Sequence, residues 1–371
     1  MTEIVQTRGY QIESHYVTTK DGYILNVFRI PRGAASDSIA TTRPPVLLQH
    51  GLLDSSYTWV NNYAYESLGF ILADAGFDVW FGNNRGNRYS RNHTTLDPND
   101  GSPEFWEFTW DDMASQDVPA VIYYILEQTG AESLGYVGHS EGTIQMFAAG
   151  VSTDDSYVSG AVSKVNIFVA LAPVTYVSQM RSKVFITLAE SALPEKLYQK
   201  GDYEFLPYGP VDQIAPEICH LVQRGCDIFL MALCGPTKHI NASRIQVYVS
   251  ETPAGTSMMN MIHWQQGVLK PTFQKFDYGT DAANTEHYGT SEPPLYDLSK
   301  LSVPTALFYG LNDYLADPND VQRLLEEAPA DKIVFTDVQE EYAHLDYTWA
   351  PDAYEKIYGK VNDLLKQYAA K

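Results

Sequence analysis

The sequence predicts a doubly wound α/β fold, with a mostly parallel sheet and a long insertion. Three observations support this prediction. Short apolar runs closed by polar loops recur along the chain, helical periods lie between most of them, and the alternation stops near residue 175 and resumes near residue 300. Strands that are apolar on both faces are typical of parallel sheets, and strand–helix alternation is typical of doubly wound domains.

The first strands form a predicted hairpin. Residues 16–19 and 23–30 alternate apolar with polar side chains, and Lys20-Asp21-Gly22 separates them. An Asp-Gly pair between two alternating segments is a strong signal for a hairpin turn.

The later elements divide the chain into a core and an insertion. Apolar runs predict strands at residues 46–48, 77–81, 134–137, 167–171, 305–309 and 333–338. Helical periods predict helices at residues 68–75, 113–127, 143–149, 320–327 and 353–368. We therefore expect a first core part at residues 1–175, a mainly helical cap and lid at residues 176–298, and a second core part at residues 299–371.

Composition and charge exclude several classes of protein. The 371 residues are 44% hydrophobic, which rules out a mainly disordered chain. The formal net charge is −21 and no Lys/Arg block occurs, so we expect no nucleic-acid partner. No stretch reaches the roughly 18 apolar residues of a membrane span. The chain also starts without the basic-then-apolar pattern of a signal peptide.

Three cysteines, Cys219, Cys226 and Cys234, lie within one short stretch. Two arrangements of these cysteines remain open: one local disulfide with a free thiol, or three buried thiols. No C-x-x-C pair or His spacing suggests zinc, and we expect neither a metal nor another cofactor. Asn92 and Asn241 each begin an N-x-[ST] sequon, which gives weak support for a secretory route.

The segment Gly138-His139-Ser140-Glu141-Gly142 matches the pattern G-x-S-x-G. It follows a predicted apolar strand and precedes a helix rich in small residues. A nucleophile elbow needs this context, because a strained turn raises the Ser hydroxyl and the glycines let strand and helix approach closely. Ser140 is therefore the candidate nucleophile, and a βα turn with an incidental Ser is the alternative.

A serine at its ordinary pKa needs a base and a group that orients the base. Asp313 and His344 each follow a predicted strand, in the chain order Ser, Asp, His that such sites use. Asp317 is a rival acid, but Ala316-Asp317-Pro318 favours a helix N-cap. The rival bases are His139, which a sharp turn directs away from Ser140, and three histidines of the insertion, His220, His263 and His287.

The tetrahedral oxyanion of ester hydrolysis needs hydrogen-bond donors. One candidate is the backbone N–H of Glu141, the residue after the nucleophile. The other is the backbone N–H of Leu52, in the loop after the strand at residues 46–48, where Gly51 permits a close turn. A plain glycine turn is the alternative for this loop.

Together these motifs resemble the acid lipase family of gastric, lingual and lysosomal lipases. The matching stretches span nearly the whole chain, at residues 48–53, 71–86, 104–106, 138–143, 253–257, 312–321 and 344–346. The resemblance implies an α/β-hydrolase core with a cap and lid that hydrolyses esters of water-insoluble lipids, triacylglycerols or steryl esters, at an emulsion or membrane interface. It implies the same nucleophile, acid, base and oxyanion donors. It also implies secretion or a lysosomal location, with a signal peptide absent from this sequence, and makes glycosylation at Asn241 plausible.

Two features depart from the family pattern. The family usually has Gln after the nucleophile, where this chain has Glu141. An ionised carboxylate near the oxyanion would repel it, so we expect Glu141 to work best protonated and to bias activity towards acid. The resemblance implies a Cys219–Cys226 disulfide, although these two cysteines are closer in sequence than the family's usual pair.

The insertion supplies a candidate lid. Residues 228–233 form a run of six apolar residues, which as a helix is apolar on all sides. A lid that meets lipid when open and an ordinary buried cap helix both fit this run. We assign the nearby aromatic residues Tyr198, Tyr203, Phe205 and Tyr208 to packing. A lipid-binding protein on a hydrolase scaffold is the alternative of a different functional class, and the intact Ser, Asp and His set argues against it.

Overall fold

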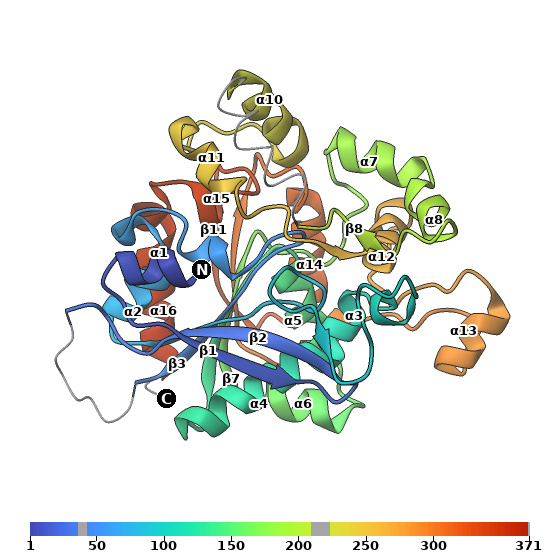
Figure 1. The fold of residues 1–371 in the computed structure, drawn as a ribbon, viewed down its shortest axis with the longest axis horizontal. Coiled ribbons are helices and arrows are strands. Elements are labelled where there is room, and N and C mark those ends of the chain that lie inside the picture. Colours follow the sequence, from blue (N-terminus) through green and yellow to red (C-terminus); the bar gives the residue numbers. More distant parts are fainter. Residues whose placement is uncertain (36–42, 209–222, 370–371) are drawn as a thin grey trace.

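The computed structural model describes residues 1–35, 43–208 and 223–369, with the side chains of residues 223–227 left aside (Figure 1). Within these residues, nine strands form the central sheet, with the order β1-β2-β4-β3-β6-β7-β10-β11 and with β5 paired to β2. The bounds are β1 Glu13–Thr18, β2 Tyr23–Ile30, β3 Pro45–Gln49, β4 Asp78–Phe81, β5 Asn92–His93, β6 Leu134–His139, β7 Val165–Leu171, β10 Thr305–Gly310 and β11 Ile333–Gln339. The strands from β4 to β11 along this order are parallel, as predicted.

Helices connect the parallel strands. The core helices are α1 Thr2–Thr7, α2 Leu68–Asp74, α3 Trp110–Asp112, α4 Val118–Thr129, α5 Glu141–Val151, α6 Ser156–Val162, α14 Pro318–Glu327, α15 Asp346–Trp349 and α16 Gly359–Ala369. Short π-helical stretches, Met113–Asp117 and Tyr354–Tyr358, precede α4 and α16. Each predicted core helix is therefore present, within a few residues of its predicted bounds.

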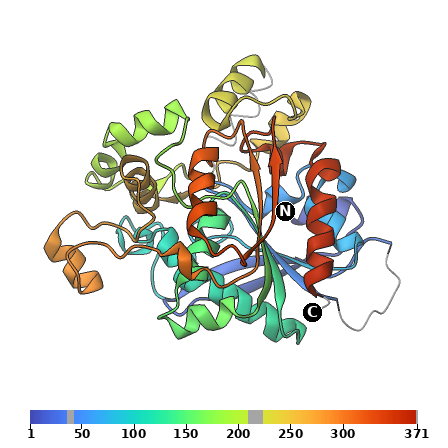
Figure 2. The same cartoon turned by 180° about the vertical axis from the view of Figure 1, so that it is seen from behind.

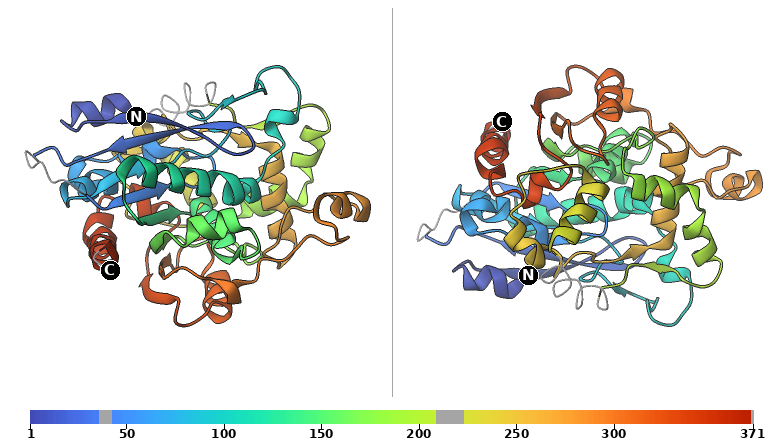
Figure 3. Two further views of the ribbon diagram at one scale, coloured as in Figure 1. Left: turned by 90° about the horizontal axis from the view of Figure 1, so that it is seen from below. Right: turned by 90° about the horizontal axis from the view of Figure 1, so that it is seen from above.

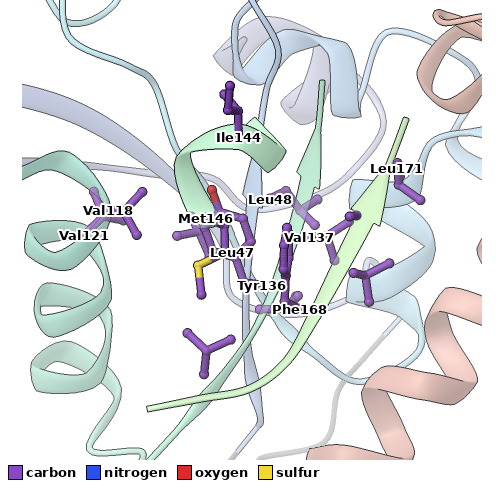
Figure 4. Close-up of a cluster of buried hydrophobic side chains, with 14 of the residues drawn as sticks. Leu47, Leu48, Val118, Val121, Tyr136, Val137, Ile144, Met146, Phe168 and Leu171 are labelled. Atoms are coloured by element: carbon purple, nitrogen blue, oxygen red, sulfur yellow. The ribbon is translucent and has the colours of Figure 1, made fainter. Parts of the chain in front are cut away.

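Helices cover both faces of the sheet. The Tyr136 hydroxyl of β6 donates to the backbone oxygen of Gly142 on α5, whereas its neighbour Gly135 lies against Leu365 of α16. Because successive strand residues point to opposite faces, α5 and α16 lie on opposite sides of β6. Seen from behind, α16 stands in front of the sheet (Figure 2). Figure 4 shows the apolar layer that results, with side chains of β3, β6 and β7 packed against α4 and α5.

The two ends of the sheet differ from its centre. The predicted hairpin is present, with β1 antiparallel to β2, although β1 begins three residues earlier than predicted, at Glu13. The strand predicted at residues 333–338 is β11, but the expectation of apolar cover on both faces is wrong there. β11 lies at the edge of the sheet and its side chains alternate between half-buried and exposed. Burial on one face alone is enough for an edge strand.

The chain between β7 and β10 forms a separate group of elements. These are α7 Lys183–Glu190, α8 Leu193–Tyr198, α10 Gln223–Cys234, α11 Ile245–Tyr248, α12 Met258–Leu269, α13 Asp281–Tyr288 and a two-stranded sheet of β8 Glu204–Phe205 and β9 Thr256–Ser257. Viewed from above, α10, α11 and α7 lie over the core, and α13 extends to one side on an arm (Figure 3). In the part of the chain that the structure describes, no helix is long and apolar enough to cross a membrane.

Candidate active site

Ser140 occupies a strained turn between β6 and α5. Its φ is +53°, a region that residues other than glycine rarely adopt. The glycines on either side are required sterically, because a Cβ on Gly138 would lie 2.6 Å from the backbone oxygen of Gly142, and a Cβ on Gly142 would lie 2.4 Å from that of Gln49. The turn therefore has the form of the predicted nucleophile elbow.

His344 and Asp313 lie in line with Ser140. His344 Nε2 is 2.7 Å from Ser140 Oγ, and His344 Nδ1 is 2.9 Å from Asp313 Oδ2 and 3.0 Å from Oδ1. All three residues are buried. Nδ1 faces a carboxylate and so carries the proton, which leaves Nε2 able to accept the proton of the Ser140 hydroxyl. The structure thus brings together the three residues that the sequence selects from distant segments.

The loop after β10 holds Asp313 in place. Asp313 Oδ1 accepts hydrogen bonds from the backbone N–H groups of Leu315 and Ala316, both at 2.9 Å. Arg181 donates to the backbone oxygen of Asp313 at 2.7 Å. The rival Asp317 is the N-cap of α14, as predicted, and its other oxygen accepts from Arg181 Nε at 2.6 Å. Asp317 therefore caps a helix and pairs with Arg181, and does not contact His344.

The rival histidines have other partners. His139 Nε2 lies 2.9 Å from the backbone oxygen of His344. His263 stacks on Trp110 with ring centroids 4.1 Å apart, and His287 stacks on Tyr278 at 3.6 Å. His220 lies outside the described residues.

The loop after β3 passes directly over the nucleophile. A Cβ on Gly51 would lie 2.9 Å from Ser140 Cβ, so only glycine fits without displacing the serine. Leu52 lines the same cavity as Ser140, and Leu53 has a φ of +59°. Across the described segments, neither the Leu52 N–H nor the Glu141 N–H has a hydrogen-bond acceptor. Both predicted oxyanion donors are therefore unpaired near the nucleophile.

The Glu141 side chain is buried against neutral donors. Its Oε1 accepts from Asn260 Nδ2 at 2.7 Å and from Trp264 Nε1 at 2.8 Å, and its Oε2 lies 3.4 Å from Asn84 Nδ2. Burial raises the pKa of Glu141 to about 7, against the lowering effect of these hydrogen bonds. Two of the donors belong to α12, so the carboxyl group joins the elbow to the cap.

An apolar cavity of about 670 Å³ lies above Ser140 and His344. Two cap helices supply much of its lining, α7 through Val184, Phe185 and Leu188, and α10 through Phe229, Leu230 and Leu233. Phe205, one of the aromatic residues assigned to packing, also lines the cavity. The volume and apolar lining suit a long hydrophobic ligand.

Helix α10 is apolar on both sides of its axis. Leu230 and Leu233 face the cavity, whereas Ile228 is 63% exposed and Phe229 is 55% exposed. Exposure of these two side chains contradicts the interpretation of α10 as an ordinary buried helix.

The end of α10 contacts the loops that carry Asp313 and His344. The backbone oxygen of Cys234 accepts hydrogen bonds from the N–H groups of His344, at 3.2 Å, and Tyr314, at 3.3 Å. Cys234 is a buried free thiol, whose pKa burial raises. The predicted Cys219–Cys226 disulfide falls outside the described residues and side chains.

Both sequons are at the surface. Asn92 in β5 is exposed, and Asn241 is exposed at the start of a short 3₁₀ helix, where its side chain accepts from the backbone N–H of Ser243 at 3.1 Å. Among the described residues, no group of three His, Cys, Asp or Glu side chains is arranged to hold a metal ion.

Several site residues have no clear signal in the sequence. Asn260 and Trp264 lie four residues apart on α12, so helical periodicity places them on one face. Periodicity does not show that this face meets Glu141. Asn84 lies in one of the stretches that resemble acid lipases, but its contact with the elbow depends on β4 and β6 lying on either side of β3 in the sheet. Arg181 likewise reaches Asp313 through the fold alone.

Comparisons with known proteins find matches over nearly the whole chain. The family model described as alpha/beta hydrolase fold matches residues 44–351, and one described as partial alpha/beta-hydrolase lipase region matches residues 1–63. The lysosomal acid lipase/cholesteryl ester hydrolase of Homo sapiens is 42% identical, over 99% of this chain and 91% of that protein. The gastric triacylglycerol lipase of Homo sapiens is 40% identical over the same shares of the two chains.

Solved structures of low sequence identity share the fold. A putative lipase from Sulfolobus solfataricus has a TM-score of 0.59 at 15% identity, covering 96% of this chain and 99% of that one. A soluble variant of monoglyceride lipase from Saccharomyces cerevisiae has a TM-score of 0.55 at 13% identity, covering 98% and 96%. On the sequence relationships above, the chain belongs to the acid lipase family of the α/β hydrolases.

Proposed function

We propose that this protein is a lipase that hydrolyses carboxylic esters of water-insoluble lipids, with triacylglycerols as its first candidate substrates. The observation that supports the proposal is the line of hydrogen bonds from Ser140 through His344 to Asp313 beneath an apolar cavity. A nucleophile with its base in place and a water-poor, apolar chamber are the two requirements for attack on a fatty acyl ester.

In the first half of the reaction, Ser140 Oγ attacks the carbonyl carbon of the ester while its proton passes to His344 Nε2. The carbonyl oxygen becomes an oxyanion, which the N–H groups of Leu52 and Glu141 stabilise. The bond to the alkoxy oxygen then breaks, and His344 returns the proton to that oxygen, so an alcohol leaves and the acyl group stays on Ser140.

In the second half, water repeats the same steps. His344 takes a proton from water, the hydroxide oxygen attacks the acyl carbon, and the bond to Ser140 Oγ breaks as the serine regains its proton. Asp313 stays ionised throughout and stabilises the imidazolium that forms twice in each cycle. The products are a fatty acid and free enzyme.

Helix α10 is the candidate lid. Its inner side chains, Leu230 and Leu233, cover the cavity, and Ile228 faces outward; Phe229 contributes to the cavity lining and is also 55% exposed. We infer that the outward side meets the lipid surface when the helix moves and that the acyl chain then enters the cavity. Apolar area that is exposed in water but buried at a lipid surface favours that position.

Steryl esters are the second candidate substrates. One relative carries the name cholesteryl ester hydrolase at 42% identity, and an apolar cavity does not discriminate between two apolar alcohols by hydrogen bonding. Turnover of emulsified trioleate against cholesteryl oleate by the same preparation measures the preference directly.

The decisive experiment separates an enzyme from a lipid-binding protein. We expect hydrolysis of an emulsified long-chain triglyceride by the wild type and none by Ser140→Ala. A phosphonate ester should label the wild type at one equivalent and leave Ser140→Ala unlabelled. Lipid binding without turnover or labelling by the wild type would overturn the proposal.

Two of the relatives are named for the lysosome and the stomach, and we propose a secretory or lysosomal location for this chain. The exposed Asn92 and Asn241 support it, because glycosylation requires surface asparagines in sequons. Expression through a secretory pathway should add glycan that Asn92→Gln and Asn241→Gln remove one at a time. Unglycosylated secreted protein would contradict this part of the proposal.

A further inference from the structure

His50 is a buried histidine beside the nucleophile that the reaction scheme above does not use. It follows β3 directly and is 2% exposed. Its Nδ1 lies 2.8 Å from the backbone oxygen of Gly51, and its Nε2 lies 3.1 Å from the backbone nitrogen of Asn84 and 3.2 Å from Asn87 Nδ2. The ring therefore joins the loop over Ser140 to the loop after β4.

The partners of His50 fix one tautomer. A backbone N–H and a side-chain amide N–H donate hydrogen bonds, so Nε2 must be the acceptor of those from Asn84 and Asn87. A backbone carbonyl accepts hydrogen bonds, so Nδ1 carries the proton and donates to Gly51. Both ring nitrogens are satisfied only in this neutral form. Burial also lowers the pKa of His50 to about 4, which keeps the ring neutral over most of the pH range.

The hydrogen bond to Gly51 acts on the peptide group that contains the Leu52 N–H. In a trans peptide the carbonyl oxygen of one residue and the N–H of the next lie on opposite sides of the C–N bond. Holding the Gly51 oxygen on the side of His50 therefore turns the Leu52 N–H to the other side. The Asp54 N–H holds the same oxygen at 3.2 Å, so His50 is one of two donors that set this orientation.

We propose that His50 is a positioning residue for the oxyanion site: its Nδ1–H holds the Gly51 carbonyl, and thereby aims the Leu52 N–H at the developing oxyanion. The proposal rests on the proposed esterase function of Ser140. The two ring nitrogens have different roles in this proposal. Nδ1 orients the peptide group that contains the oxyanion donor, whereas Nε2 anchors the ring.

Two amide substitutions separate the ring nitrogens of His50. The Asn amide nitrogen takes the place of Nδ1, so His50→Asn keeps the donor to Gly51. The Gln amide group takes the place of Nε2, so His50→Gln keeps a partner for Asn84 and loses the donor. His15→Gln is the matched control. His15 is a half-buried histidine of β1 that forms a hydrogen bond with Tyr124 of α4, away from the cavity.

The measurement is hydrolysis of a soluble ester, p-nitrophenyl butyrate, with kcat expressed per site from the endpoint of phosphonate labelling. We expect His50→Gln to lower kcat by at least tenfold and by no more than about 1,000-fold, the loss expected for a whole oxyanion donor. KM should stay within about threefold of the wild type. His50→Asn should keep kcat within tenfold, and His15→Gln should leave it unchanged.

Equal kcat per site in the wild type and both His50 variants, with only a lower Tm in the variants, would overturn the proposal. A loss in His50→Asn as large as that in His50→Gln would also overturn it. If either variant does not fold, ¹⁵N NMR of the wild type decides: the Nδ1–H tautomer supports the proposal and the Nε2–H tautomer refutes it. Absence of any hydrolysis by the wild type would instead refute the proposed function, so the two failures are distinct.

Discussion

At the scale of single residues, Asp313 and Asp317 show how two carboxylates four positions apart take different roles. Asp313 faces His344 Nδ1, whereas Asp317 caps α14 and pairs with Arg181. An amide at position 313 presents either a donor that opposes Nδ1–H or an oxygen without charge. We therefore expect Asp313→Asn to lower kcat by about 10⁴-fold through the wrong histidine tautomer.

Asp317→Asn is the matched control for that prediction. Asparagine is as good an N-cap as aspartate, so kcat should stay within a few fold while the ion pair with Arg181 is lost. The measurement is kcat on a soluble ester at neutral pH for both variants. A larger loss of kcat in Asp317→Asn than in Asp313→Asn would reverse the assignment of the acid.

Glu141 makes a second prediction at this scale, for the pH dependence of activity. With a pKa of about 7, above its ordinary value, the carboxyl is mostly protonated at pH 5 and mostly ionised at pH 8. The ionised form puts a negative charge beside the oxyanion donor, so activity should fall as pH rises through 7. Glu141→Gln stays neutral and should lose that fall, which raises its ratio of neutral to acid rates.

The control for the Glu141 prediction is another buried carboxyl group whose pKa is also raised to about 7. Burial raises the pKa of Asp111 to about 7, but its partners are Tyr296 and the backbone of Phe276, away from the cavity. Asp111→Asn should leave the ratio of neutral to acid rates unchanged. Equal ratios in the wild type and Glu141→Gln would show that Glu141 does not set the pH dependence.

The sequence predicts the candidate catalytic residues better than the groups that support them. Ser140, Asp313 and His344 are selected because each has a motif or a strand end and because the three follow a fixed order. The partners of Glu141, and the role of His50, depend on which loops meet in space. A hydrogen bond between residues more than a hundred positions apart, such as that from Trp264 to Glu141, leaves no trace in local periodicity.

At the scale of elements, the core follows the sequence because its strands and helices have distinct periods. The predicted burial is wrong at the edge of the sheet. The sequence of β11 is apolar enough to predict burial on both faces, but one of its faces is exposed. The cap is less predictable. An apolar run such as that of α10 indicates a helix with no polar face, but composition alone does not say which side covers a cavity.

Helix α10 carries the third prediction. Ile228 is 63% exposed and is not part of the cavity lining, so its role is at a surface. Transfer of a large aliphatic side chain out of water is worth about 1.5–3 kcal/mol, or roughly tenfold or more in binding. Ile228→Ser should therefore lower hydrolysis of emulsified triglyceride by about tenfold and leave hydrolysis of soluble p-nitrophenyl butyrate unchanged.

Leu295→Ser provides the control for the lid prediction. Leu295 is 67% exposed, follows α13 in the chain, forms an isolated bridge with Gln274 and is not part of the cavity lining. The same loss of apolar area there should leave both activities unchanged. Equal losses on the emulsion in the two variants would mean that general surface hydrophobicity, rather than α10, controls adsorption.

At the scale of the whole molecule, the net charge of −21 opposes approach to an anionic lipid surface. Surface carboxyl groups have pKa values near 4, so many of them are neutral below about pH 5 and the repulsion falls. Salt screens the same repulsion, with a Debye length of about 10 Å at 0.1 M. Acid and salt should therefore act on adsorption in the same direction, through the same cause.

We therefore predict how the hydrolysis of triglyceride emulsions depends on an anionic or a zwitterionic lipid coat. At pH 7 and low salt the anionic coat should lower the rate, and 0.5 M salt should restore it towards the rate on the zwitterionic coat. At pH 4.5 the two coats should give similar rates at either salt concentration. Because Glu141→Gln changes one buried group, its rates should keep the same dependence on coat and salt. Loss of that dependence in Glu141→Gln would show that the acid preference comes from Glu141 instead of from the net charge. An anionic coat without effect on the wild type at pH 7 would contradict a role for the net charge.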